Sequence, residues 1–121
     1  MVLDRSHLLI VEDDIAVQAT LDELFSREGY DVAIANNGGD AIELLEHGMR
    51  PCCVLVDLLM PGIVGHELLS YMQEDPHRSI PVAIITGSPH LAPTGYPMFS
   101  KPLDTQALLD FVGARCPVRN A

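Results

Sequence analysis

Short apolar runs alternate with amphipathic stretches along the whole chain. Five runs are mainly apolar and of strand length, at residues 8–11, 31–35, 52–56, 80–85 and 97–100. Four longer stretches repeat apolar residues every three or four positions, at residues 14–28, 40–48, 64–72 and 104–113. The runs predict strands buried on both faces, and the stretches predict helices with one apolar side. This alternation is typical of an α/β fold, in which helices cover both faces of a parallel sheet.

Glycine, proline and acidic residues mark the ends of the predicted helices. Gly29 ends the first helix, because glycine readily adopts the left-handed conformation common after a helix. Asp75-Pro76 ends the third helix, and Asp104 is placed to cap the start of the last one. No linker, repeat or low-complexity segment interrupts the pattern. Residues 1–121 are therefore expected to form a single domain.

Charge and composition exclude several kinds of protein. The net charge of −10 disfavours direct binding to nucleic acids, whose phosphates attract basic surfaces. No apolar run approaches the roughly 18 residues of a membrane span, and the N-terminus lacks a secretion signal. We therefore expect a cytoplasmic protein with no membrane association. Cysteines and histidines show no metal-ligand spacing. We interpret Cys52 and Cys53 as small buried side chains and the five histidines as surface residues.

Chemically active side chains follow four of the five predicted strands. In chain order they are Glu12, Asp13 and Asp14 after the first strand, Asp57 after the third, Thr86 after the fourth and Lys101 after the fifth. Ligand sites of open parallel sheets lie at the carboxyl ends of the strands. If the first and third strands are neighbours, three carboxylates converge, and their mutual repulsion calls for a cation. Such oxygen ligands favour Mg2+, while the hydroxyl and ammonium groups are suited to phosphoryl oxygens.

Four sequence segments resemble the response-regulator receiver family of two-component systems. They are LLIVEDD at residues 8–14, VLVDLLMPG at 54–62 with Gly65 after it, IITG at 84–87 and KPL at 101–103. They occur in the family's order and extend over essentially the whole chain. The resemblance implies a flavodoxin-like, doubly wound sheet of five parallel strands in the order 2-1-3-4-5, with helices on both faces. It also implies a cis peptide bond between Lys101 and Pro102.

The resemblance further implies a role for each residue at the strand ends. Asp57 would be the nucleophile that accepts a phosphoryl group from a phosphohistidine, as an acyl phosphate. The groups that bind Mg2+ would be Asp13, Asp57 and the main-chain carbonyl of Leu59, with Glu12 acting through water. Thr86 and Lys101 would bind the phosphoryl oxygens. Asp14 lies one position beyond the family's acidic pair, where a helix cap is the better role.

The connection between the fourth and fifth strands departs from the family pattern, which has a full helix there. Residues 87–96 contain Pro89, Pro93 and Gly95. Each interior proline destabilises a helix by about 3 kcal/mol. We therefore expect the fourth helix to be absent or reduced to a turn, as in a minority of receivers.

A second departure concerns the aromatic residue that normally follows the switch hydroxyl. Met98 occupies the position where the family usually has Tyr or Phe. Phe99 should face the other side of the strand, because side chains alternate along a strand. Whether Tyr96 substitutes from the preceding loop is left open.

Together, these residues favour a receiver that takes a phosphoryl group on Asp57 with Mg2+ and changes the surface offered to a partner. We do not expect an enzyme acting on an external substrate, because the related hydrolases have a second Asp where this chain has Leu59. A flavin-binding module is disfavoured by the acids after the first strand. A degenerate receiver that serves as a docking module remains the alternative. The expected donor is a sensor histidine kinase or histidine phosphotransfer protein, while the downstream partner and homodimer formation are left open.

Overall fold

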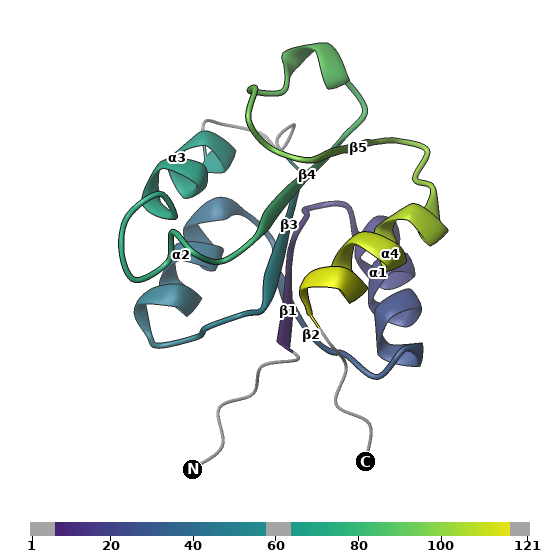
Figure 1. Ribbon diagram of the computed structural model, residues 1–121, viewed down its shortest axis with the longest axis horizontal. Coiled ribbons are helices and arrows are strands. Elements are labelled where there is room, and N and C mark those ends of the chain that lie inside the picture. The colour runs from purple at the N-terminus through teal and green to yellow at the C-terminus, as the bar shows by residue number, and fades with distance from the viewer. Residues whose placement is uncertain (1–6, 58–63, 117–121) are drawn as a thin grey trace.

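The structure is a computed structural model that describes residues 7–57 and 64–116 of the chain. Its elements are β1 (His7–Val11), α1 (Ile15–Arg27), β2 (Asp31–Ala35), α2 (Gly38–Glu46), β3 (Cys53–Asp57), α3 (Val64–Tyr71), β4 (Val82–Thr86), the 3-10 turn η1 (Pro89–Leu91), β5 (Met98–Ser100) and α4 (Thr105–Arg115). The predicted strands and helices are all present, with bounds that differ from the expected ones by a few residues. Figure 1 shows the helices arranged on two sides of a central sheet.

The five strands form one parallel sheet in the order β2-β1-β3-β4-β5. This order confirms the flavodoxin-like fold expected from the sequence. β1 lies beside β3, with Val11 opposite Val56, so the residues that follow these two strands meet at one edge of the sheet. On the other side of β3, Asp57 pairs with Ile85 of β4. The carboxyl ends of β1, β3 and β4 are therefore side by side.

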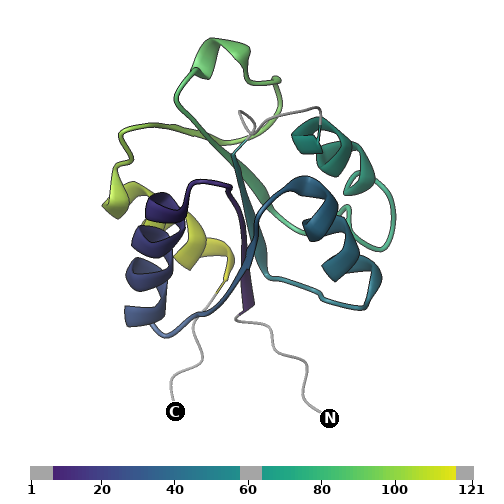
Figure 2. The same cartoon turned by 180° about the vertical axis from the view of Figure 1, so that it is seen from behind.

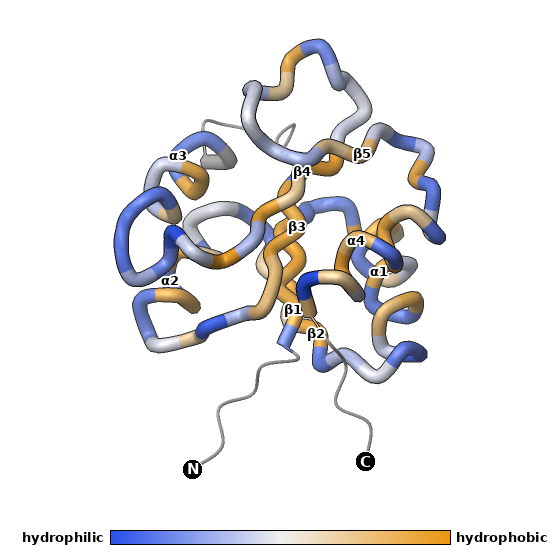
Figure 3. Tube along the Cα trace, in the orientation of Figure 1, coloured by the Kyte–Doolittle hydropathy of each residue, from blue (hydrophilic) through white to orange (hydrophobic). Residues whose placement is uncertain are grey.

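The sheet separates two apolar cores. Alternate side chains of β1, β3 and β4 face α2 and α3 on one side, and the others face α1 and α4 on the other side. Figure 2 shows the same two layers from behind. All five residues of β3 are buried. In Figure 3 the central strands are the most continuous apolar stretch of the chain. This burial on both faces explains why the central strands are apolar at every position rather than at alternate positions.

Side-chain caps define where α1 and α4 begin. Asp14 accepts hydrogen bonds from the main-chain nitrogens of Ala16 (2.9 Å) and Val17 (3.3 Å), which is the capping role expected for it. Asp104 accepts one from Ala107 (3.1 Å) at the start of α4. Gly29 follows α1 with a φ of 98°, as predicted for the end of that helix. Within the described ranges, the helices are too short or too polar to be transmembrane segments.

The connection between β4 and β5 contains the short turn η1 in place of a full helix, as predicted. Figure 1 shows η1 beyond the carboxyl edge of the sheet, above the ends of β4 and β5. As a result, the described residues include no helix packed across β5 on the side of α3. Met98 of β5 is 42% exposed on that side. Phe99 faces the opposite side, as expected, and its ring packs edge-on against Phe111 of α4 with the centroids 5.4 Å apart.

A disulfide between Cys52 and Cys116 joins the start of β3 to the end of α4. The interpretation of Cys52 as a small buried hydrophobic residue was therefore wrong, whereas Cys53 is a buried free thiol as expected. Burial raises the pKa of Cys53 to about 12, so this thiol stays protonated at neutral pH. Cys116 is also held by Tyr30, whose hydroxyl donates a hydrogen bond to the Cys116 carbonyl at 2.6 Å.

His77 is buried, which corrects its interpretation as a surface residue. The residue is 5% exposed, and its ring lies 4.9 Å from that of Tyr71, centroid to centroid. Its Nε2 atom has no hydrogen-bond partner among the described residues. Burial lowers the pKa of His77, the charge of Arg50 lowers it further, and a hydrogen bond with the Leu45 main chain acts in the opposite direction.

The lowered pKa of His77 predicts that the chain loses stability in mild acid. Below about pH 6.5, His77 binds a proton more readily in the unfolded chain than in the folded chain. The free energy of unfolding therefore falls as the pH drops. The loss approaches about 1.4 kcal/mol per pH unit between the two pKa values. Denaturant titrations from pH 7 to 5 should show a smaller loss for His77→Phe than for the native chain. Replacing the exposed His90 with Gln should leave the pH dependence unchanged, and an unchanged slope in His77→Phe would contradict this account.

Candidate functional site

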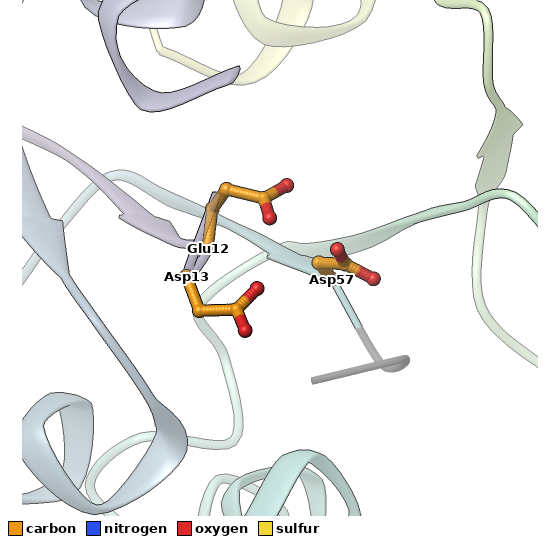
Figure 4. A group of neighbouring side chains, drawn as sticks. All are labelled: Glu12, Asp13 and Asp57. Atoms are coloured by element: carbon orange, nitrogen blue, oxygen red, sulfur yellow. The ribbon is translucent and has the colours of Figure 1, made fainter. Parts of the chain in front are cut away.

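Three carboxylates meet at the carboxyl ends of β1 and β3. One carboxylate oxygen from each of Glu12, Asp13 and Asp57 lies within 4.8 Å of the others. Figure 4 shows the Glu12 and Asp13 carboxylates extending from the end of β1 toward Asp57 at the end of β3. Glu12 is fully buried and Asp57 is 5% exposed, while Asp13 is open to solvent. The parallel pairing of β1 with β3 is what brings together residues 45 positions apart.

Lys101 connects two of these carboxylates. Its Nζ atom lies 3.2 Å from Glu12 Oε1 and 3.0 Å from Asp57 Oδ2, and donates a hydrogen bond to each. The lysine follows β5, where its main-chain nitrogen donates to the Thr86 carbonyl at 2.8 Å. The Lys101–Pro102 peptide bond is cis, as the sequence resemblance implied. Strands from three parts of the chain therefore contribute to one ionic cluster.

The pKa values of the cluster follow from burial and from these contacts. Burial raises the pKa of Glu12 and the charge of Asp57 adds to the rise, whereas hydrogen bonds from the Asp14 nitrogen and Lys101 lower it. For Lys101, burial lowers the pKa, but hydrogen bonds to Asp57 and Glu12 outweigh that effect and leave the pKa above its ordinary value. Lys101 is therefore firmly charged, whereas the ionised form of the Glu12 carboxyl is less favourable than that of an ordinary glutamate.

The residues present fit a small divalent cation. Three carboxylates face a single ammonium group, so the site keeps an excess of negative charge that Lys101 alone does not neutralise. Carboxylate oxygens are hard ligands, which Mg2+ and Ca2+ prefer over softer donors. Mg2+ is usually held by one or two carboxylates and completes its coordination with water and phosphate oxygens. Leu59, whose carbonyl was expected to be a further ligand, lies outside the described residues.

Thr86 is positioned by the end of β4 and by the turn that follows. It is 1% exposed, and its Oγ1 atom accepts a hydrogen bond from the Ser88 main-chain nitrogen at 3.0 Å. A hydroxyl that accepts one hydrogen bond still has its own proton to donate. Gly87 has open space where a side chain would begin, with nothing within 4 Å of an added Cβ. Residue 87 therefore leaves the space beside Thr86 open to a bound group.

Met98 occupies the position where the family usually has an aromatic residue. Met98 pairs with Ile84, so Tyr96 lies two positions earlier, near the start of β4 and away from Thr86. Tyr96 accepts a hydrogen bond from Gln73 at 3.1 Å, which holds it against the end of α3. Neither Phe99, which faces α4, nor Tyr96 therefore takes the place of the family's aromatic residue.

Gln18 is a site-supporting residue that the sequence did not indicate. Its Nε2 atom donates to the Glu12 carbonyl at 2.5 Å and to Asn36 Oδ1 at 2.8 Å. These bonds tie the turn that carries Glu12 and Asp13 to α1 and to the turn after β2. A glutamine one turn into a helix belongs to no motif. The role of Gln18 is therefore recognised only once the structure places Glu12 and Asn36 beside it.

Comparison with known proteins agrees with this geometry. Residues 8–112 match the family described as the response regulator receiver domain. The chain belongs to this family. Among its relatives, sporulation initiation phosphotransferase F of Bacillus subtilis is 31% identical, and the match covers 93% of this chain and 95% of that protein. The transcriptional regulatory protein AfsQ1 of Streptomyces coelicolor is 33% identical over 65% of this chain, which spans 34% of the length of AfsQ1.

A solved receiver domain shows the same fold. The receiver domain of the sensor histidine kinase PA1611 from Pseudomonas aeruginosa superposes with a TM-score of 0.82 at 19% identity. The superposition covers 93% of this chain and 98% of that domain, whose crystal structure has a magnesium ion coordinated in the active site cleft. The predictions of a receiver fold and of membership in a two-component family are therefore confirmed.

Proposed function

We propose that this receiver accepts a phosphoryl group on Asp57. The observation that carries the proposal is the contact of Lys101 with both Asp57 and Glu12, beside the Asp13 carboxylate. A buried carboxylate beside a fixed ammonium group and two further acids is suited to phosphoryl transfer, which depends on positioning and on charge neutralisation. Residues 1–121 would act as a single receiver domain in the cytoplasm.

Asp57 would act as the nucleophile. An oxygen of its carboxylate attacks the phosphorus of a phosphohistidine, the P–N bond breaks, and the electron pair leaves with the imidazole, which takes up a proton. Mg2+, bound by Glu12, Asp13, Asp57 and the Leu59 carbonyl, would neutralise charge on the phosphoryl oxygens; a magnesium ion occupies the corresponding cleft of the PA1611 receiver. Lys101 would turn from the carboxylates to pair with a phosphoryl oxygen.

Thr86 would donate its hydroxyl proton to another phosphoryl oxygen while it still accepts from Ser88. The donor is a sensor histidine kinase or a histidine phosphotransfer protein. The acyl phosphate would form and hydrolyse on the chain itself, with no turnover of an external substrate. Because the Thr86 hydroxyl is bonded to the Ser88 nitrogen just before η1, a shift of this hydroxyl would reach the segment at residues 87–96.

Amide NMR spectra with Mg2+ and then beryllofluoride, a phosphoryl mimic, test this proposal. Mg2+ alone should shift the amides near Asp13 and Asp57, because the cation changes the local charge. Beryllofluoride should then shift Thr86, Gly87 and Lys101, and these second shifts should be missing in Asp57→Asn. A control substitution of the exposed Asp22 with Asn should respond like the native chain. If Mg2+ binds but beryllofluoride shifts nothing, the chain is a docking module without phosphorylation.

A further inference from the structure

A groove lies where the short β4–β5 connection leaves the sheet uncovered. Its volume is about 440 Å3, and its walls are the end of α3, the approaches to β4 and β5, and the last turns of α4. Because η1 projects beyond the carboxyl edge of the sheet, no helix among the described residues fills this space (Figure 1). We call this space, at the end of the strands opposite the acidic site, the α3–β5 groove.

Apolar side chains form much of the groove. Leu69 and Met72 come from α3 and the turn after it, Val82 begins β4, and Phe111 comes from α4. Tyr96 lines the side nearest β5, where its hydrogen bond from Gln73 joins two walls and keeps the groove in shape. A groove of this size and lining accepts several apolar side chains of a partner.

Two guanidinium groups give the groove a positive character. Arg78 and Arg115 both line it, in a chain whose net charge is −10 and which has seven lysines and arginines in all. The Arg115 guanidinium lies 3.8 Å from the centroid of the Phe111 ring and donates to the Phe111 carbonyl at 3.1 Å, which fixes its position. Arginine in a fixed position is suited to bind carboxylates through two parallel hydrogen bonds.

Arg78 forms an exposed ion pair, in which a carboxylate of a partner can take the place of Asp75. Its Nε atom is 3.3 Å from Asp75 Oδ1, and the two side chains are 68% and 79% exposed. An ion pair this exposed contributes at most about 1 kcal/mol, so a partner carboxylate can replace Asp75 with little loss. The excess negative charge of the chain repels acidic partners at long range. Within a Debye length of about 8 Å, however, a partner carboxylate meets Arg115 and can replace Asp75 beside Arg78.

We propose that the α3–β5 groove docks an amphipathic segment of a partner protein that carries Asp or Glu beside its apolar residues. The apolar side chains enter between Met72, Val82 and Phe111, and the carboxylates pair with Arg78 and Arg115. This docking needs no phosphoryl group on Asp57, because the groove is already open in the structure with its arginines in place. It therefore goes beyond the proposed function and can succeed or fail independently of it.

Selection from a displayed library of random peptides of about 16 residues, with the intact chain as bait and no phosphodonor, tests the proposal. We expect the enriched sequences to combine Leu, Ile or Phe with Asp or Glu. A synthetic peptide of the enriched sequence should shift the amides of Val82, Gly95 and Tyr96. A second groove lies between α1 and the segment after β5, lined by Val17, Lys101 and Leu103 among others. Enrichment of basic sequences, absence of any enrichment, or amide shifts confined to this second groove would overturn the proposal.

Charge-reversal variants provide the quantitative test. Binding of the enriched peptide should weaken at least tenfold in R78E/R115E, and a peptide with its acids changed to Lys should prefer this variant over the native chain. R78E alone, at an exposed position, should give part of the effect if R115E disturbs folding. R27E/R50E has the same net charge as R78E/R115E but leaves the groove intact, and should bind like the native chain. Equal affinities for the two double variants would overturn the proposal.

Discussion

Replacing Lys101 with methionine is expected to lower the free energy of unfolding by about 2 kcal/mol at neutral pH without divalent cations. The substitution keeps the length of the side chain but leaves Glu12 and Asp57 buried beside each other with no ammonium group between them. Breaking a fully buried ion pair costs about 3–5 kcal/mol. The loss here should be smaller, because the Lys101 side chain is 28% exposed and water can partly replace it.

Denaturant titrations with and without Mg2+ would measure this effect. A bound cation would neutralise the carboxylates that lose their lysine, so saturating Mg2+ should stabilise K101M more than it stabilises the native chain. Arg27→Met is the matched control, because Arg27 pairs with Glu23 on the surface of α1. That substitution should change stability by less than about 0.5 kcal/mol, and Mg2+ should stabilise it by the same amount as the native chain. A loss in K101M no larger than in the control would show that Lys101 is not coupled to the carboxylates.

Reduction of the Cys52–Cys116 disulfide is expected to destabilise the chain by about 3 to 4 kcal/mol. The two cysteines are 64 positions apart, so the bond restricts a long loop of the unfolded chain. The native contacts around Cys116 do not depend on the bond, since the Tyr30 hydroxyl still reaches its carbonyl and α4 remains packed on β3. The reduced chain should therefore stay folded, with a lower unfolding midpoint.

Unfolding of the native chain in the presence and absence of a thiol reductant would test this prediction. A double variant with Ser at positions 52 and 116 should match the reduced chain and show no response to reductant. Cys53→Ser is the control, because Cys53 is a free thiol and takes no part in the disulfide. The unfolding midpoint of this variant should fall on reduction by as much as that of the native chain. Identical midpoints for the oxidised and reduced chains would contradict the prediction.

The ionic cluster was predictable from the sequence once the family resemblance supplied the order of the strands. Apolar strands buried on both faces are visible as runs, and a parallel sheet aligns their carboxyl ends, so Glu12, Asp13 and Asp57 could be grouped before any coordinates. The prolines of residues 87–96 likewise ruled out a helix there, and the structure has η1 instead. The absence of a helix needed only the pattern within one segment, whereas grouping the carboxylates also needed β1 and β3 to be neighbours, an order that the family resemblance implied.

The features that the sequence did not reveal depend on contacts between distant elements. Cys52 and Cys116 are partners because α4 crosses the start of β3, and nothing near either cysteine indicates this. His77 was interpreted as a surface residue, like the other histidines, yet it is buried and its ring lies against that of Tyr71. Gln18 supports the acidic turn through the fold of α1 against β2. Such contacts are set by packing rather than by periodicity.

The α3–β5 groove is another feature that the sequence did not reveal. The sequence predicted that a helix would be missing, but not whether neighbouring elements would close over the space. In the structure a groove remains between the end of α3 and the last turns of α4, and the Tyr96 hydroxyl accepts a hydrogen bond from Gln73. Under the proposed function, a change in the surface of this receiver would have to be transmitted without the family's aromatic residue, through the segment that joins Thr86 to β5.

The central claim is that Asp57 accepts a phosphoryl group with the help of a divalent cation. Intact-mass analysis after incubation with acetyl phosphate tests this most directly. The native chain should gain one phosphoryl group only when Mg2+ is present, the adduct should be removed by hydroxylamine, and Asp57→Asn should remain unlabelled while Asp22→Asn is labelled normally. Labelling that persists in Asp57→Asn, or a native chain that stays unlabelled with Mg2+, would contradict the claim.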